Sequence, residues 1–268
     1  MPLVEVNGIS LSYHDKGTGD PVLMLMGTGS SGRVWHLHQQ PALVAAGYRV
    51  ITVDNRGIAP TSECADGITV ADMAADVAAL AERLDLPRFD LVGTSLGARI
   101  AIEVAATRPD LVRGLVLMAT RSRAEALHAA FDAGELELAK AGIRLPARYH
   151  AASTALWNLS PRTLFDAGKA REWLDVLEFG TQPPSRGVLA QMAIADDPDL
   201  LAVCAKITAS TLVIAFADDV MTPPHLGREV ADAIAGARFG LVADGGHYGY
   251  LEQPAEVNSQ LLEFLGQR

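Results

Sequence analysis

The chain has 268 residues, of which 49% are hydrophobic, and its 32 acidic and 22 basic residues give a formal net charge of −10. This acidic balance, without a long run of Lys or Arg, argues against nucleic acid or an anionic membrane as a partner. No run of about 18 uncharged apolar residues and no secretory leader pattern is found. We therefore expect a protein that neither spans a membrane nor is secreted, with a cytoplasmic location.

The two cysteines, Cys64 and Cys204, lie far apart in the sequence and in no CxxC or CxxH arrangement. This spacing disfavours both a structural metal site and a disulfide framework. We therefore expect two free thiols and no bound metal.

Strand-like and helix-like segments alternate through the first part of the chain, which predicts parallel strands joined by crossover helices. Asn7 and Gly8 lie between two short strand-like runs and predict an opening β-hairpin. The further predictions are buried strands at 22–26, 49–53 and 112–118, a strand beginning at Phe89, and helices at 35–46, 69–84 and 96–107.

The pattern changes between residues 121 and 208, where apolar residues recur at helical spacing and strand-like runs vanish. Several prolines punctuate this stretch, namely Pro146, Pro161, Pro183, Pro184 and Pro198. Strand character resumes at 211–215 and 238–242, with helices near 225–235 and after Pro254. We expect an α/β core formed by residues 1–120 and 209–268, interrupted by an all-helical cap at 121–208.

The strand beginning at Phe89 leads into the sequence GTSLG, which contains Ser95 between Gly93 and Gly97. A serine hydroxyl becomes a nucleophile only when a base takes its proton, and a tight strand-to-helix turn keeps its surroundings open. The two glycines are expected to relieve crowding at this turn. Ser95 is therefore the candidate nucleophile.

A base and an acid follow later in the chain. Asp218 and Asp219 come directly after the predicted strand 211–215, and His247 follows the strand 238–242 in the sequence DGGHY. The glycines would let this loop bring the imidazole back over the sheet edge. The chain order serine, aspartate, histidine is that of the α/β hydrolases rather than of other serine hydrolase folds.

The chain resembles the capped α/β-hydrolase superfamily over essentially its whole length, from the hairpin to the segment HYGYLEQP that begins at His247. In that family the acid loop commonly carries two aspartates, of which the second is the triad member. Asp219 matches this position, and its separation from His247 is also typical. The resemblance therefore implies Asp219 as the acid, with Asp218 as the alternative. Asp218 would otherwise be a solvated or helix-capping charge.

Attack on a carbonyl carbon creates an oxyanion, which two backbone N–H groups usually bind. One donor is expected from Leu96, at the start of the helix that follows the nucleophile. The resemblance places the other at Thr28, in the turn after the strand that ends at Met26. Met26 departs from the family, which usually has histidine there, and Phe216 departs from the glycine that often precedes the acid.

Other polar residues are expected to be structural or to line the substrate pocket. The segment DNRG at 54–57 resembles a turn of the family whose aspartate and arginine hold loops together, so Asp54 and Arg56 are interpreted as structural. The histidines with weaker claims to catalysis are His14, His36, His38, His128, His150 and His225.

The resemblance implies hydrolysis of a carboxylic ester or lactone without a cofactor. The chain is similar to polyketide-tailoring esterases and to cofactor-free haloperoxidase-like esterases, which points to secondary metabolism. The same triad also serves thioesterases and carbon–carbon bond hydrolases of diketones. A lyase that eliminates an acyloxy group would use the same histidine as its base, and a catalytically silent ligand-binding protein on this fold would normally have lost a triad residue.

Substrate choice is expected to lie in the cap, whose apolar content suggests a medium-sized hydrophobic small molecule. The large apolar residues expected near the cavity mouth or within a small cap core are Leu127, Phe131, Leu145, Tyr149, Trp157, Phe165, Trp173 and Phe179. Arg144 and Arg148, about one helical turn apart, are interpreted as facing solvent rather than as a carboxylate site.

Overall fold

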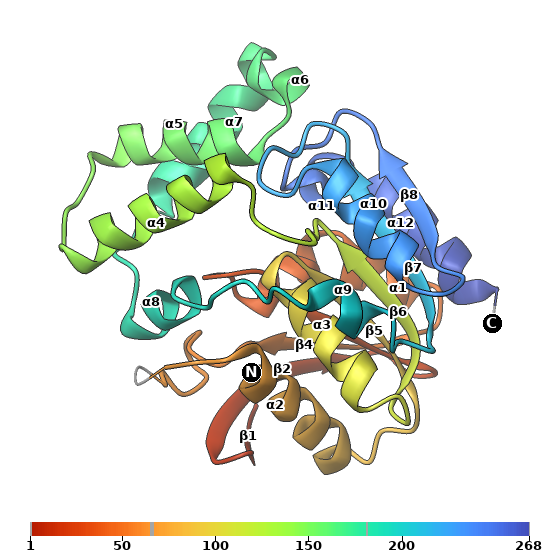
Figure 1. Cartoon of the computed structure of the whole chain (residues 1–268). Coiled ribbons are helices and arrows are strands. Elements are labelled where there is room, and N and C mark those ends of the chain that lie inside the picture. Colours follow the sequence, from red (N-terminus) through yellow and green to blue (C-terminus); the bar gives the residue numbers. More distant parts are fainter. Residues whose placement is uncertain (1, 65–66, 181, 268) are drawn as a thin grey trace.

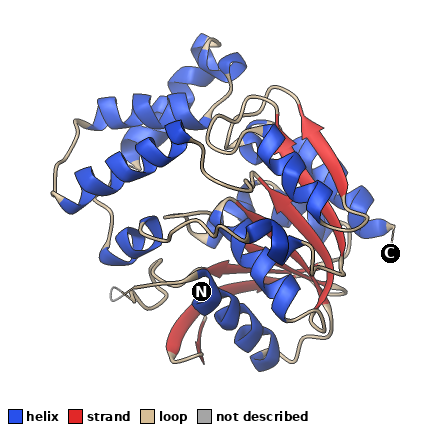
Figure 2. Ribbon diagram, in the orientation of Figure 1, coloured by secondary structure: helices blue, strands red, loops and turns tan. Residues whose placement is uncertain are grey.

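The computed structural model describes residues 2–64, 67–180 and 182–267. Over these residues the chain forms one eight-stranded sheet between layers of helices (Figure 1, Figure 2). The strands are β1 (Leu3–Val6), β2 (Ile9–Lys16), β3 (Pro21–Leu25), β4 (Arg49–Asp54), β5 (Phe89–Thr94), β6 (Val112–Met118), β7 (Ser210–Phe216) and β8 (Arg238–Val242). Their spatial order is β1-β2-β4-β3-β5-β6-β7-β8. β2 pairs antiparallel with β1 and with β4, and the other pairs are parallel.

The helices fall into two groups. Those outside the segment between β6 and β7 are η1 (Gly32–Leu37), α1 (Gln39–Ala45), α2 (Val70–Arg83), α3 (Leu96–Thr107), α10 (Pro224–Ala233), α11 (Gly249–Glu252) and α12 (Pro254–Gly266). Those between β6 and β7 are α4 (Ala126–Lys140), α5 (Ala147–Asn158), α6 (Pro161–Leu164), α7 (Ala167–Phe179), α8 (Arg186–Met192) and α9 (Leu200–Cys204). The predicted fold class is confirmed: a mostly parallel sheet with helices on both faces and a helical insertion after the sixth strand.

Two hydrophobic layers hold the sheet, one on each face. Leu23 and Leu25 of β3 enter the layer formed with α2, α3, α9 and α10, whereas Val22 and Met24 enter the layer formed with η1, α1 and α12. Successive side chains of a strand point to opposite faces, so a strand covered on both faces must be apolar throughout. This explains why β3 is a continuous apolar run.

Local geometry confirms the predicted hairpin and shows what starts the helix predicted at 69–84. Asn7 and Gly8 have φ of 45° and 75°, as a two-residue hairpin turn between β1 and β2 requires. Thr69 caps α2, because its hydroxyl accepts the N–H of Asp72 while the Asp72 carboxylate accepts the N–H of Thr69.

The single helix predicted at 35–46 is wrong. The chain instead forms the 3-10 helix η1 and then α1, separated at His38, whose φ and ψ are −140° and −52°. Pro41 explains the break, because it has no N–H to continue a helix from Leu37. In the first turn of α1 that missing donor costs nothing, since the first N–H groups of a helix have no intrahelical partner.

The inserted helices lie over the carboxyl end of the parallel strands, with α8 set apart from the group α4 to α7 (Figure 1). α9 differs from the others because its residues Leu200 and Cys204 pack into the same hydrophobic layer as α3 and α10. Below, the word cap denotes only α4 to α8, which is a shorter segment than the cap expected at 121–208. Among the described helices, none combines the length and the apolar character needed to cross a membrane.

Candidate active site

Ser95 lies at the junction of β5 and α3 in a strained conformation. Its φ and ψ are 54° and −120°, a region that residues other than glycine rarely adopt. Its N–H donates to the carbonyl of Met118 at 3.0 Å, which ties the junction to the end of the neighbouring strand β6. The turn therefore holds the serine at the carboxyl edge of the sheet.

Gly93 and Gly97 permit this turn to be so tight. A Cβ on Gly93 would collide with the carbonyl of Gly97, and a Cβ on Gly97 would collide with the carbonyl of Leu25 in β3. The start of α3 thus packs directly on backbone at the end of the sheet. This is the relief of crowding that the sequence GTSLG predicts.

Asp219 and His247 are in direct contact. Oδ2 of Asp219 lies 2.9 Å from Nδ1 of His247, and the two residues are only 3% and 8% exposed. The Asp219 carboxylate also accepts hydrogen bonds from its own loop. Its Oδ1 accepts the N–H groups of Met221 and Thr222 at 2.8 Å. The Thr222 hydroxyl donates to Oδ2 at 2.6 Å. These bonds suit an ionised carboxylate, which only accepts.

Asp218 takes no part in this contact. It is half-buried, and its backbone N–H donates to the carbonyl of Gly245 at 2.9 Å. The geometry therefore pairs His247 with the second aspartate of the loop rather than the first.

His247 is carried by the loop between β8 and α11, which is fixed against the cap. The N–H of Tyr248 donates to the carbonyl of Asn158 at the end of α5. Glu252 accepts the N–H of Gly246 at 2.7 Å and that of Ser160 at 2.9 Å. One carboxylate thus joins the histidine loop to the cap, a role that the sequence analysis did not anticipate.

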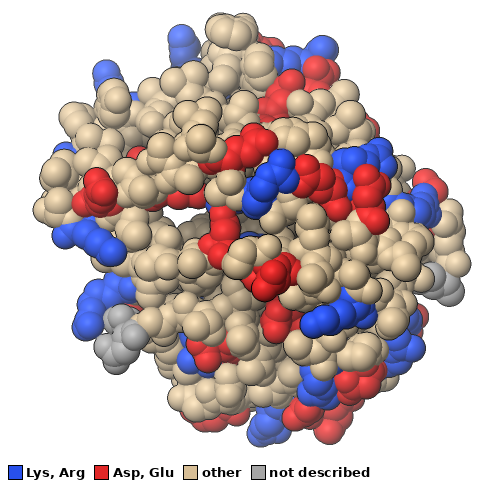
Figure 3. All heavy atoms as spheres, in the orientation of Figure 1, with Lys and Arg blue, Asp and Glu red and all other residues tan. Residues whose placement is uncertain are grey.

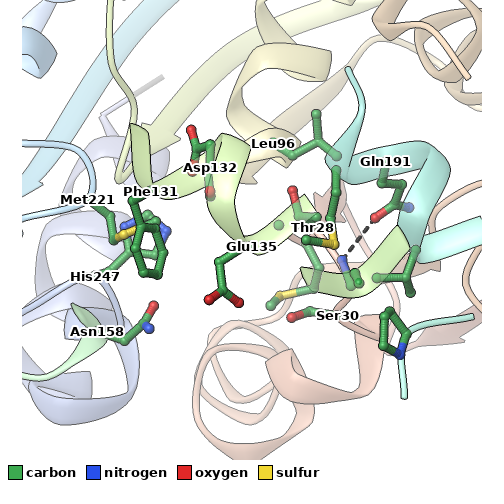
Figure 4. A pocket seen from close by; sticks show the side chains of 18 of the residues that line it. Thr28, Ser30, Leu96, Phe131, Asp132, Glu135, Asn158, Gln191, Met221 and His247 are labelled. Atoms are coloured by element: carbon green, nitrogen blue, oxygen red, sulfur yellow. Dashed lines mark hydrogen bonds between the residues drawn. The ribbon is translucent and has the colours of Figure 1, made fainter. Parts of the chain in front are cut away.

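One cavity of about 1180 Å³ is lined by Ser95, Leu96, Thr28 and His247, whereas Asp219 reaches it only through its contact with His247. Figure 4 shows Thr28, Leu96 and His247 around the cavity with side chains from the cap, such as Glu135. Leu96 begins α3, so its N–H is one of the unpaired donors of a helix start. On the face seen in Figure 3, the surface is hollowed between the cap and the sheet, and acidic side chains lie beside the hollow.

The departures from the family pattern have packing roles. Met26 is 1% exposed, lies in the hydrophobic layer with Trp35, and its carbonyl accepts the side-chain N–H of Asn55 at 2.8 Å. Phe216 is fully buried in the same layer and lies against Gly249. Met26 therefore packs under the loop that carries Asn55, and Phe216 packs against the histidine loop at Gly249.

Asp54 and Arg56 hold loops, as the sequence predicts. Asp54 accepts the hydroxyls of Ser12 and Ser31 at 2.9 and 2.6 Å. Arg56 forms a two-pronged ion pair with Asp76 on α2, and this hydrogen bonding raises the pKa of the guanidinium.

Of the other histidines, His150 lines the cavity, whereas His14, His36, His128 and His225 make structural contacts. His14 and His36 contact each other beside the sheet, His225 pairs with Glu125, and Nε2 of His128 lies 2.6 Å from the carbonyl of Val220. Both cysteines are free, and burial raises the pKa of the Cys204 thiol to about 12. Among the described residues no group of His, Cys, Asp and Glu is arranged to hold a metal ion.

The large apolar residues of the cap divide between the cavity and the surface. Phe131 and Leu145 line the cavity, and the ring of Trp157 packs on Phe131 at 4.1 Å. Phe165 and Phe179, by contrast, are 88% and 91% exposed, so neither belongs to a cap core, and neither lines the cavity. Helical spacing alone does not show which face of α7 or of its neighbouring residues is buried against other elements.

The two cap arginines also separate. Arg148 faces solvent as predicted and lies 3.6 Å from Glu178. Arg144 instead lines the cavity, although it is also exposed.

A charged wall of the cavity was not predicted from the sequence. Arg121 contacts Asp132 of α4 at 2.8 Å and Asp196 at 3.4 Å, and Arg99 of α3 contacts Asp196 at 3.4 Å. Glu135, one turn after Asp132, projects into the cavity (Figure 4). The only advance signal was the spacing of Asp132 and Glu135, which places both on one helix face.

A mostly parallel sheet with a serine turn after β5 and a helical insertion after β6 is the architecture of the α/β hydrolases. A family described as alpha/beta hydrolase fold matches residues 20–254. The chain therefore belongs to the alpha/beta hydrolase fold family.

Individual relatives agree with this placement. The chain is 45% identical over 257 residues to a protein of Mycobacterium tuberculosis (strain H37Rv) named "Putative non-heme bromoperoxidase BpoC", covering 96% of this chain and 98% of that one. The crystal structure of that protein superposes with a TM-score of 0.92, covering 96% of each chain. A "Putative carbamate hydrolase RutD" of Variovorax paradoxus (strain S110) is 31% identical, covering 94% of each chain. A thermophilic esterase from Thermogutta terrifontis is 26% identical with a TM-score of 0.85, covering 100% of this chain and 99% of that one. Together these matches support an enzyme with hydrolase activity.

Proposed function

We propose that the protein is a serine hydrolase that cleaves a carboxylic ester or lactone with Ser95 as nucleophile, His247 as base and Asp219 as the acid that orients the base. The observation that carries this proposal is the buried contact of 2.9 Å between Asp219 and His247, because His247 lines the same cavity as the strained Ser95. An imidazole fixed through one nitrogen presents the other to a nucleophile.

In the proposed reaction, the Nδ1–H of His247 donates to Asp219, which leaves Nε2 to take the proton of Ser95. The serine oxygen attacks the carbonyl carbon, and the backbone N–H groups of Thr28 and Leu96 bind the resulting oxyanion. Each such donor stabilises the transition state by about 2.7–4 kcal/mol. The imidazolium then protonates the leaving alcohol. Water, deprotonated by the same imidazole, releases the acid and restores Ser95.

The cavity has ample room for a medium-sized substrate, and its lining offers both apolar and polar contacts. Its volume of about 1180 Å³ lies above the range of about 300–1,000 Å³ typical of small-molecule sites. Phe131 and Leu145 offer apolar contact, whereas Arg144 and Glu135 offer charge. The relatives named as an esterase and a carbamate hydrolase favour an acyl substrate.

Labelling and turnover with Ser95→Ala test the proposal, with Ser153→Ala as the control because Ser153 is a serine of the cap helix α5 that does not line the cavity. We expect Ser95→Ala to lose both fluorophosphonate labelling and hydrolysis of p-nitrophenyl esters, and Ser153→Ala to keep both. Full labelling of Ser95→Ala would exclude the nucleophile. The released acid should carry oxygen from labelled water, and its absence would favour elimination by a lyase instead.

A further inference from the structure

Gln191, on the cap helix α8, is joined to the turn that carries the predicted oxyanion donor Thr28. Its Oε1 accepts the N–H of Gly29 at 2.9 Å, the bond drawn as a dashed line in Figure 4, and its Nε2 donates to the carbonyl of Arg56 at 2.8 Å. The residue is only 2% exposed. Both ends of a buried amide are thus satisfied by backbone from two different loops, as burial of a polar group requires.

The turn from Gly27 to Ser30 has firm anchors on either side of Gly29. Before it, the carbonyl of Met26 accepts a bond from Asn55, and after it Ser31 is bound by Asp54. Between these points, the bond within the turn from the N–H of Ser30 to the carbonyl of Gly27 is long, at 3.3 Å. The contact with Gln191 is therefore the anchor at the centre of the turn.

This contact bears directly on the orientation of the Thr28 N–H. Gly29 adopts a φ of +71°, and the peptide group between Thr28 and Gly29 is the one that Gln191 holds. The two peptide groups on either side of Thr28 share its Cα, so holding one restricts the direction of the N–H in the other.

The helix α8 packs closely against the loop after β4, so the position of Gln191 relative to that loop is fixed. A Cβ on Gly187 would collide with the carbonyl of Gly57, and its backbone neighbour Arg186 donates its N–H to Glu63 at 3.1 Å. Gly187 and Gln191 are four residues apart, so they face the same way along the helix. Gly187 allows α8 to lie close to the loop after β4, and at this distance the side chain of Gln191 reaches Gly29.

Resting on the proposed function, we propose that Gln191 is a positioning residue that holds the turn from Gly27 to Ser30 so that the Thr28 N–H meets the oxyanion. Interactions that act only in the transition state change kcat and leave substrate binding largely intact. Gln191 should therefore affect turnover far more than KM.

The test compares Gln191→Met, which keeps the approximate side-chain length and removes both hydrogen bonds, with Leu189→Ala, a control on the same helix that does not line the cavity. For hydrolysis of a p-nitrophenyl ester we expect Gln191→Met to lower kcat by about tenfold or more with KM within about twofold, and the affinity for a trifluoromethyl ketone transition-state analogue to fall in parallel. Leu189→Ala should change neither.

Unchanged kcat and analogue affinity in Gln191→Met would overturn the inference, and so would a rise in KM alone, which would mean that Gln191 only anchors the cap. If Gln191→Met fails to fold, Gly187→Ala provides the second variant, because it lifts α8 from Gly57 and should lower kcat in the same selective way. Gly187→Ala with normal turnover would equally overturn the inference. Failure of the proposed function itself is distinguishable, since the unaltered enzyme would then not hydrolyse the ester.

Discussion

Among individual residues, the neighbours Asp218 and Asp219 provide the clearest contrast, because they share charge and loop but not surroundings. Asp219 is buried and contacts His247, whereas Asp218 is half-buried and its N–H bonds to Gly245. The acid of a triad fixes the tautomer of the histidine and stabilises the imidazolium. Only Asp219 is placed to do this.

We therefore expect Asp219→Asn to lower kcat for ester hydrolysis by about four orders of magnitude, the size found when the triad aspartate of a serine protease is changed in this way. Asp218→Asn should stay within about twofold of the unaltered enzyme. Steady-state turnover of a p-nitrophenyl ester, on variants shown by circular dichroism to be folded, measures both. Equal losses in the two variants would contradict the assignment.

The site residues that could be predicted from the sequence are those that lie in short, recognisable sequence motifs. Ser95 lies in GTSLG, and Asp219 and His247 follow buried strands whose carboxyl ends must meet at one sheet edge. Gln191 and Arg99 do not lie in any such motif. Their roles depend on which turn or helix the cap meets after folding, and no spacing within α8 or α3 encodes that partner.

Among the elements, the joint between the loop after β4 and the helix α2 depends on a buried ion pair. The side chains of Arg56 and Asp76 are 13% and 4% exposed, and Asp76 also accepts a bond from Asn7 in the opening hairpin. Removing one partner of a buried pair leaves the other charge without compensation, which costs far more than losing an exposed pair.

Arg56→Met should therefore lower the free energy of unfolding by about 3 kcal/mol. The matched control is Arg49→Met, which breaks the more exposed pair with Asp15 and should cost about 1 kcal/mol or less. Urea denaturation followed by fluorescence gives both values. The prediction would be wrong if the two variants lost stability equally.

The limits of sequence reasoning about elements are visible between residues 35 and 46. Helical spacing predicted one helix, but Pro41 and the conformation of His38 divide it into η1 and α1. The core strands were easier to predict, because a strand covered on both faces must be continuously apolar, as β3 is. In the cap, α7 has no fully buried residue, so its periodicity carried little information about packing.

The molecule as a whole is acidic, and its response to pH combines two kinds of group. Hydrogen bonds hold the pKa values of several carboxyls below their usual range, among them Asp72, bonded to Thr69, and Glu229, bonded to Ser122 and Arg123. A lowered carboxyl pKa contributes stability that is present above its ordinary value, near 3.8 for Asp and 4.5 for Glu, and is lost as the pH falls through the folded-state value. Protonation of these carboxyls therefore reduces stability only below about pH 4.5.

His36 acts at milder pH. Burial lowers its pKa below the ordinary value of 6.5, and electrostatic interactions with His14 and Arg33 lower it further. The unfolded chain then binds a proton at this histidine before the folded protein does. The stability that neutral His36 contributes is complete above pH 6.5 and declines as the pH falls from 6.5 toward the folded-state pKa, before the carboxyls begin to titrate.

We expect the urea midpoint of the unaltered protein to fall between pH 7 and pH 5.5, and His36→Gln to reduce this slope because a neutral amide replaces the titrating ring near Thr52. His225→Gln is the control, since the side chain of His225 is 57% exposed and its contact with Glu125 lies at the surface. Midpoints measured at half-unit pH steps separate the outcomes. If His36→Gln kept the full slope, or if His225→Gln removed it, the acid sensitivity in this range would not come from His36.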